Sequence, residues 1–126
     1  MFSSLSIYFR YCTSALFANI SNTAGHEHAY MRSKGVKYGK VDASGPQYII
    51  IGDGGNREGH GDYFSDEQEE WVSYRDNTTF GFGTLSFENS THARWSWLKN
   101  SHILGTEIVD DALILNQFFT ERLRSL

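Results

Sequence analysis

The sequence predicts an α+β fold that is rich in strands and mostly antiparallel. Aromatic residues make up 15% of the chain, and Pro46 is the only proline. Aromatic and β-branched residues are favoured in strands. Several short segments alternate between apolar and small or polar residues, which is the period of a half-buried strand, whereas helical spacing is confined to a few stretches.

Three helices are expected, two of them near the ends of the chain. Residues 5–16 carry apolar side chains spaced by four, three and four positions, and residues 117–126 carry a similar stripe. The shorter segment 66–75 is predicted to be helical, with Ser65 or Asp66 as its N-terminal cap. The small and polar segment 19–25 is expected to be a loop.

Four strands are expected between these helices. Residues 47–51 form a β-branched run bounded by Pro46 and Gly52, which is typical of a buried strand. Residues 80–88 and the segment containing Ala93, Trp95 and Trp97 are separated by Asn-Ser, and this pattern predicts a hairpin with an aromatic face. Residues 112–115 are predicted to be another buried strand.

Composition and charge exclude several functional classes. A chain of 126 residues is one domain at most, or a piece of one. The net charge of −4 provides no basic patch for nucleic acid, and no apolar run is long enough to span a membrane. The single cysteine, Cys12, excludes an internal disulfide. Glycosylation triplets begin at Asn19, Asn77 and Asn89, whereas Arg10 interrupts the N-terminal segment where a signal peptide would be apolar.

The segment Gly25-His26-Glu27-His28-Ala29-Tyr30 is the clearest candidate for chemistry. Two histidines at i and i+2 would point to opposite faces of a strand, but in a loop or at a strand end both imidazoles can converge on metal ions. Taken alone, His26 and His28 fit either metal ligands or two surface histidines, and both interpretations stay open on local grounds.

A glycine-rich segment, 52–61, follows the expected strand at 47–51. It lacks the last glycine of a dinucleotide fingerprint, the Lys-Ser/Thr pair of a P-loop and the oxygen ligands of an EF-hand. A tight structural turn is therefore the better interpretation.

The remaining polar and aromatic candidates favour structural roles. We expect His60, His92 and His102 to be surface or packing residues. Paired tryptophans on one strand face, such as Trp95 and Trp97, are more often core than a stacking platform. Arg75 and Asp76 are expected to be solvated charges.

Several of these signals occur in one order that resembles the C-terminal segment of purple acid phosphatases. Gly25-His26-Glu27-His28-Ala29-Tyr30-Met31-Arg32-Ser33 is similar to the last metal-binding block of that family, Gly-His-x-His-Ala-Tyr-Glu-Arg. The similarity continues through segments 48–59, 74–76, 80–83 and 89–97, and it extends over residues 25–116. Residues 1–24 are then a divergent N-terminal segment, expected to be helical, and residues 117–126 a C-terminal helix or tail.

The resemblance implies the C-terminal part of a metallophosphatase β-sandwich flanked by helices, and thus an incomplete domain. It also implies a binuclear metal centre, an Fe(III) ion with a divalent Fe, Zn or Mn ion, that hydrolyses phosphate monoesters. By motif, His26 would bind the divalent ion and His28 the ferric ion; no catalytic or cofactor-binding residue beyond these is assigned. A secreted or vacuolar glycoprotein and a possible homodimer are further implications of the family.

Two departures from the family pattern shape the functional hypothesis. Met31 replaces the usual glutamate, and the blocks Asp-x-Gly, Gly-Asp-x-x-Tyr, Gly-Asn-His and Val-x-x-His have no counterpart. Asp53-Gly54-Gly55 fits the first of them by letters only. We therefore expect a fragment of a purple acid phosphatase that is inactive alone. The alternative is a non-catalytic β-rich module that binds through the hairpin around Trp95 and Trp97.

Overall fold

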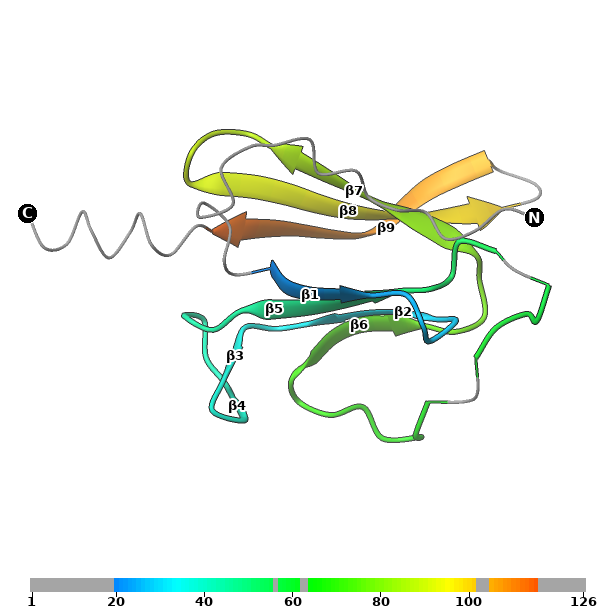
Figure 1. Cartoon of the computed structure of the whole chain (residues 1–126), viewed down its shortest axis with the longest axis horizontal. Coiled ribbons are helices and arrows are strands. Elements are labelled where there is room, and N and C mark those ends of the chain that lie inside the picture. The colour runs from blue at the N-terminus through cyan, green and yellow to red at the C-terminus, as the bar shows by residue number, and fades with distance from the viewer. Residues whose placement is uncertain (1–19, 56, 62–63, 102–104, 116–126) are drawn as a thin grey trace, which may run out of the picture.

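The computed structural model describes residues 20–55, 57–61, 64–101 and 105–115, without the side chains of residues 20–23. Its strands form a four-stranded and a three-stranded sheet that lie one over the other, with a small two-stranded hairpin beside them (Figure 1). Nine strands are present among the described residues: β1 (Ile20–Ala24), β2 (Tyr30–Ser33), β3 (Val36–Lys37), β4 (Lys40–Val41), β5 (Gln47–Ile51), β6 (Val72–Asp76), β7 (Gly81–Phe87), β8 (His92–Ser101) and β9 (Gly105–Leu115). This part of the chain contains no helix, and so no helix that could cross a membrane.

The four-stranded sheet has the order β1-β5-β2-β6. The inner strand β2 is antiparallel to both of its neighbours, whereas β1 runs parallel to β5. The hairpin β3–β4 leaves this sheet after β2, and its turn residues Tyr38 and Gly39 both have positive φ, as a type I′ turn requires.

The three-stranded sheet has the order β7-β8-β9 and is antiparallel throughout. Period-two alternation sets its inner face, because Trp95 lies opposite Leu85 on one side and Ala112 on the other. Two residues away on the same face, Ala93 lies opposite Ile114, and both are buried.

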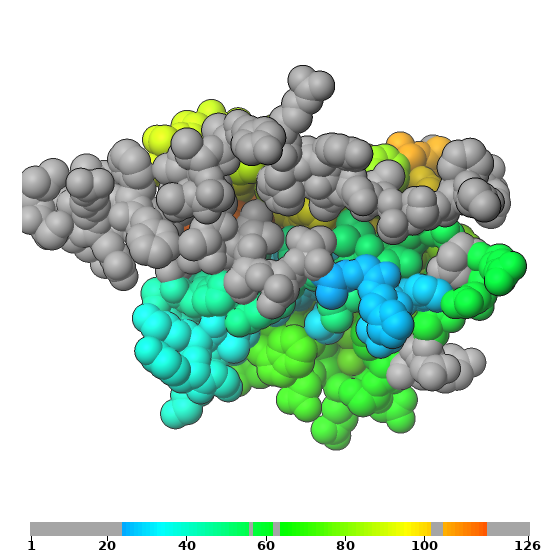
Figure 2. Space-filling view, viewed as in Figure 1, coloured from blue at the N-terminus to red at the C-terminus, as the bar shows by residue number. Residues whose placement is uncertain are grey.

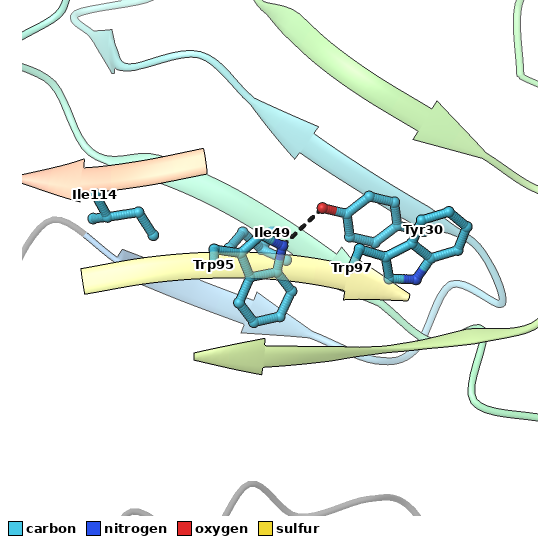
Figure 3. Packing of buried hydrophobic residues seen from close by; sticks show 5 residues of the cluster. All are labelled: Tyr30, Ile49, Trp95, Trp97 and Ile114. Atoms are coloured by element: carbon cyan, nitrogen blue, oxygen red, sulfur yellow. Dashed lines mark hydrogen bonds between the residues drawn. The ribbon is translucent and has the colours of Figure 1, made fainter. Parts of the chain in front are cut away.

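The core lies between the two sheets and is mainly aromatic. Its buried members are Tyr30, Ile49, Trp95, Trp97 and Ile114, three of which are drawn from the second sheet and two from the first (Figure 3). Burying a large apolar side chain contributes about 1.5–3 kcal/mol, so these five residues supply a major share of the apolar stabilisation.

The strand predictions for the centre of the chain are confirmed. The expected strand at 47–51 is β5, the expected hairpin is β7–β8, and residues 112–115 are the end of the longer β9. Trp95 is 3% exposed and Trp97 is fully buried, so both are core residues, as expected. The mostly antiparallel sandwich is therefore found.

Two local predictions are wrong. The helix expected at 66–75 is absent: its first half is a bent loop, and Val72–Asp76 is β6. Val72 is buried beside β2, so tertiary pairing overrides the helical propensity of the preceding glutamates. The loop expected at 19–25 contains β1, whose polar residues are held by backbone pairing to β5.

The helices expected to flank the sandwich are not shown. Those at 5–16 and 117–126 lie outside the described residues, and the third is replaced by loop and strand.

Candidate metal centre

The register of the four-stranded sheet brings three connections to one edge. Tyr30, the first residue of β2, lies opposite Ile51 at the end of β5 and opposite Asp76 at the end of β6. Ala24, at the end of β1, lies opposite Ile50. The turn between β1 and β2, which contains His26 and His28, is therefore next to the loops that follow β5 and β6 (Figure 1).

Backbone hydrogen bonds fix this histidine turn, residues 25–29. The Ala29 amide donates to the Glu27 carbonyl at 2.9 Å, which tightens the turn internally. The Gly61 amide donates to the His28 carbonyl at 2.9 Å, and the Gly52 amide donates to the Ala29 carbonyl at 3.1 Å. Both external donors belong to the loop after β5, so residues 52–61 hold the turn from one side.

Gly52 is required by this close approach. A Cβ atom at Gly52 would lie 1.9 Å from the Glu27 carbonyl oxygen, a distance at which the backbone must move. The expected tight structural turn at 52–61 is thus present, with Gly55 and Gly59 at positive φ, and its first glycine seats the histidine turn.

Both imidazoles reach the surface. His26 is exposed, and the side chain of His28 is 26% exposed. Its Nε2 atom lies 4.0 Å from Oε2 of Glu58, a separation too long for a hydrogen bond. In Figure 2 the blue surface is the segment that begins at residue 24 and contains the histidine turn. It lies beside the green surface of the loop after β5, and it is open to solvent.

The turn stands on a buried aromatic stack. The rings of Tyr30 and Trp97 are parallel within 1°, with centroids 4.3 Å apart (Figure 3). Tyr74 packs against both at 5.9 Å. Because Tyr30 is two residues after His28 and is the first residue of β2, this stack fixes the strand end that follows the histidine turn.

A buried polar network joins the two sheets at Tyr30. Its hydroxyl donates to Asp110 Oδ2 at 2.6 Å and accepts from Trp95 Nε1 at 2.8 Å. Arg32 donates to both oxygens of Asp110, each at 2.7 Å. Burial by itself would raise the pKa of Asp110, but the donors Arg32 and Tyr30 hold it below its usual value. Burial raises the pKa of Tyr30 far above its ordinary value, and the hydrogen bond to Asp110 raises it further.

A second buried carboxylate, Asp53, lies at the start of the glycine-rich loop. Its Oδ2 atom accepts a hydrogen bond from Trp97 Nε1 at 2.8 Å, while its buried Oδ1 atom has no hydrogen-bond partner among the described residues. Burial raises the pKa of Asp53, and the hydrogen bond from Trp97 does not offset that effect.

The donor set fits part of a metal centre. Neutral imidazole is a good ligand for zinc and iron, and His26 and His28 share one fixed, solvent-accessible turn. Among the described residues no three metal-ligating side chains of the His, Cys, Asp or Glu type gather in one place. These residues can hence supply two ligands, and the other ligands of a closed site must come from elsewhere.

The other polar candidates have structural partners. His60 stacks on Phe80 at 4.1 Å, and His92 is held in the hairpin turn by Thr91 and Asn89, whereas His102 lies outside the described residues. Arg75 is not simply solvated, because it donates to the Ser65 carbonyl and covers the ring of Phe64, next to a shallow hollow at the surface.

Asp76 is likewise more than a solvated charge. Its Oδ1 atom accepts from the amides of Thr78 and Thr79 and so shapes the turn before β7.

The burial of Trp95 and Trp97 removes the surface on which the binding-module alternative depended. Sequence reasoning missed the roles of Arg32 and Asp110, since partners 78 residues apart leave no local signal.

Comparison with known proteins assigns the family. The family model described as "Iron/zinc purple acid phosphatase-like protein C" matches residues 45–111, which is more than half of the chain. The chain belongs to the purple acid phosphatase family. The family resemblance is thereby confirmed, and the matched residues include the glycine-rich loop.

Individual relatives agree with this assignment. Purple acid phosphatase 18 of Arabidopsis thaliana is 51% identical over 76 residues, covering 60% of this chain and 17% of its own length. Fe(3+)-Zn(2+) purple acid phosphatase 12 of the same plant is 39% identical over 108 residues, covering 76% of this chain and 22% of its own length. The chain therefore spans about a fifth of the curated purple acid phosphatases that it matches.

A solved purple acid phosphatase from yellow lupin (Lupinus luteus) seeds shares the fold. Its TM-score to this chain is 0.60 at 18% identity, over 74% of this chain and 17% of the lupin chain. This likeness supports the sandwich architecture.

Proposed function

We propose that this chain is the C-terminal part of a purple acid phosphatase that hydrolyses phosphate monoesters at a binuclear centre. His26 would bind the divalent ion, and His28 the ferric ion. The observation that carries this proposal is the histidine turn itself, which two amides of the glycine-rich loop hold at the exposed edge of the sheet. The name of the Arabidopsis relative, Fe(3+)-Zn(2+) purple acid phosphatase 12, supports iron and zinc as the ions.

The two histidines alone cannot complete such a centre. When bound, the two ions would neutralise charge on the phosphoryl oxygens and lower the pKa of a bound water. One imidazole for each ion leaves most coordination positions to other ligands, and the missing motif blocks are where the family would supply them. We therefore expect the 126-residue chain to have little phosphatase activity.

Metal binding tests the role of the turn. We expect the purified chain to bind Co²⁺, used as a spectroscopic probe, weakly and in a manner that His26→Ala and His28→Ala each diminish. His92→Ala is the matched control. His92 is the first residue of β8, five residues before Trp97, and it is Trp97 that stacks on Tyr30 at the end of the histidine turn. Equal binding by the chain and by the His26→Ala, His28→Ala double variant would refute the assignment.

Activity tests the fragment proposal. With Fe³⁺ and Zn²⁺ supplied, a chromogenic phosphate monoester should be hydrolysed no faster than by buffer containing the same ions. Metal-dependent hydrolysis that is abolished by His28→Ala would show instead that the chain forms a working centre.

Exposed apolar side chains support the same proposal. Ile108, Leu113 and Leu115 on β9 are 57%, 45% and 45% exposed. β9 is an edge strand of the three-stranded sheet, and an exposed edge strand with apolar side chains is a place where another strand or chain can pair. We expect the chain to bind a hydrophobic dye more strongly than a self-sufficient domain of similar size does.

We also propose passage through the secretory pathway, to a secreted or vacuolar destination. Asn89 is exposed in the β7–β8 turn and begins the triplet Asn-Ser-Thr, which is an acceptor for N-glycan. In a plant expression host, glycosidase treatment should lower the apparent mass of the chain, and Asn89→Gln should reduce that shift.

A further inference from the structure

We infer that Asp53 is a positioning residue for the histidine turn and acts through the glycine-rich loop. As far as metal binding is concerned, this inference rests on the proposed function. Neither the metal-ligand assignment nor the family resemblance gives Asp53 a role, since its match to a ligand block is one of letters only.

Asp53 is anchored to the opposite sheet. The residue is completely buried, and its side chain accepts from the indole of Trp97 in β8 at 2.8 Å. Its main-chain carbonyl accepts from the Gly81 amide, at the start of β7, at 3.1 Å. Two strands of the three-stranded sheet thus determine where the glycine-rich loop begins.

The glycine-rich loop connects Asp53 to the histidine turn. Gly52 precedes Asp53 directly, and its amide bonds the Ala29 carbonyl while its Cα region packs on Glu27. At the other end of the loop, the Gly61 amide bonds the carbonyl of His28. A shift of Asp53 away from Trp97 would therefore move the backbone that holds the histidine turn.

Stability alone does not explain a carboxylate at position 53, because a buried carboxylate oxygen with no hydrogen-bond partner among the described residues is costly. Only the Oδ2 atom of Asp53 is needed for the positioning contact, where it accepts a hydrogen bond from Trp97. Asparagine offers that oxygen without the charge, whereas alanine does not, so the two substitutions separate the positioning bond from the charge.

The same hydrogen bond can be removed by substituting its donor, Trp97. Trp97→Phe keeps an aromatic ring to stack on Tyr30 but removes the N–H donor. If the bond is what positions the loop, Asp53→Ala and Trp97→Phe should have the same local effect, and Asp53→Asn should have almost none.

The experiment is amide hydrogen exchange, measured by NMR on the metal-free 126-residue chain. We expect Asp53→Ala and Trp97→Phe each to accelerate exchange of the Gly61 amide by about 10- to 100-fold relative to the β8 amides, as loss of a hydrogen bond to a charged group implies. Asp53→Asn should exchange like the original chain. Ile114→Ala is the control for global destabilisation, since this core residue lies opposite Ala93, four residues along β8 from Trp97.

Co²⁺ binding is the second measurement. Loss of an outer support of a metal ligand typically lowers affinity 10- to 100-fold, so affinity should fall in Asp53→Ala and recover in Asp53→Asn. The inference is overturned if the Gly61 amide in Asp53→Ala accelerates only as much as the β8 amides, as in Ile114→Ala, or if Asp53→Asn behaves like Asp53→Ala. If the original chain binds no Co²⁺, the proposed function fails, while the exchange rates still decide the role of Asp53.

Discussion

Two buried carboxylates, Asp110 and Asp53, lie against the same aromatic core and are perturbed in opposite directions. Asp110 is 7% exposed and accepts three hydrogen bonds, two of them from a guanidinium. Asp53 is completely buried and accepts one hydrogen bond at its carboxylate, from an indole. The pKa of Asp110 is lowered despite its burial, and the pKa of Asp53 is raised because of it.

The difference shows that hydrogen-bond donors, more than the depth of burial, determine the direction in which the pKa of a buried carboxylate shifts. With every oxygen partnered and an opposite charge beside it, Asp110 joins β9 to β2 as an ion pair that spans the sandwich. One oxygen of Asp53 has no hydrogen-bond partner in the described part of the chain, so the charge of this carboxylate is unfavourable where its backbone is held. Asp110 is the charge partner that the buried Arg32 requires, and Asp53 positions a loop.

The largest effect should follow from breaking the Arg32–Asp110 pair. Asp110→Ala leaves the Arg32 guanidinium buried without its partner, so we expect a loss of about 3–5 kcal/mol in the free energy of unfolding. Urea unfolding measures this loss. Replacing both partners, as in Arg32→Met with Asp110→Leu, should cost clearly less than Asp110→Ala. A double variant that is as unstable as the single one would show that the ion pair itself supplies the stability.

A smaller effect is expected at the loop that Asp53 anchors. Gly52→Ala places a methyl group against the Glu27 carbonyl, and such overpacking typically costs about 1–3 kcal/mol. Gly54→Ala is the matched control, because a Cβ there would meet nothing within 4 Å. We expect Gly52→Ala, and not Gly54→Ala, to shift the His28 resonances in an NMR spectrum. Equal spectra for the two variants would mean that the loop does not hold the turn.

The sequence predicts the fold best where the signal is local. Alternation of Ala93, Trp95 and Trp97 is enough to predict the buried face of β8, and the β-branched run at 47–51 is enough for β5. The polar strand β1 was missed because its stability comes from backbone pairing with β5, which its side chains do not indicate.

The sequence predicts the two candidate ligands of the site, but not the residues that support them. His26 and His28 form a recognisable motif, and Gly52 belongs to a visible glycine-rich segment. The indole bond that anchors Asp53 comes from a residue 44 positions away, and the partner of Arg32 is 78 positions away. Such pairs become neighbours only when the two sheets pack.

The two buried acids should also give opposite pH dependences. The folded-state pKa of Asp110 is lowered, so its stabilisation is present above the ordinary aspartate pKa of about 3.9 and is lost as the pH falls through the folded-state value. The folded-state pKa of Asp53 is raised, so stability is higher below about pH 3.9 and declines as the pH rises through the folded-state value.

Asp53→Asn isolates the second contribution. At neutral pH we expect it to leave stability unchanged or to increase it by up to about 1 kcal/mol, because the acceptor for Trp97 is kept and the buried charge is removed. Urea midpoints measured from pH 4 to pH 8 should decline with pH more steeply in the original chain than in this variant. Parallel curves would indicate that the Asp53 charge is compensated in the folded state.

The smallest effect is expected at Asp111, the immediate neighbour of Asp110 on the other face of β9. Asp111 is exposed, and Arg94 bonds both Asp111 and Glu88 at the surface. Side-chain entropy and solvent screening offset most of the benefit of an exposed ion pair. We therefore expect Arg94→Ala to leave the urea midpoint nearly unchanged, in contrast to Asp110→Ala. The small salt dependence of the midpoint in the original chain should be absent in Arg94→Ala. A large loss on Arg94→Ala would mean that the guanidinium acts through packing of its stem on the outer face of β8, so the contrast between adjacent aspartates would no longer be one of burial alone.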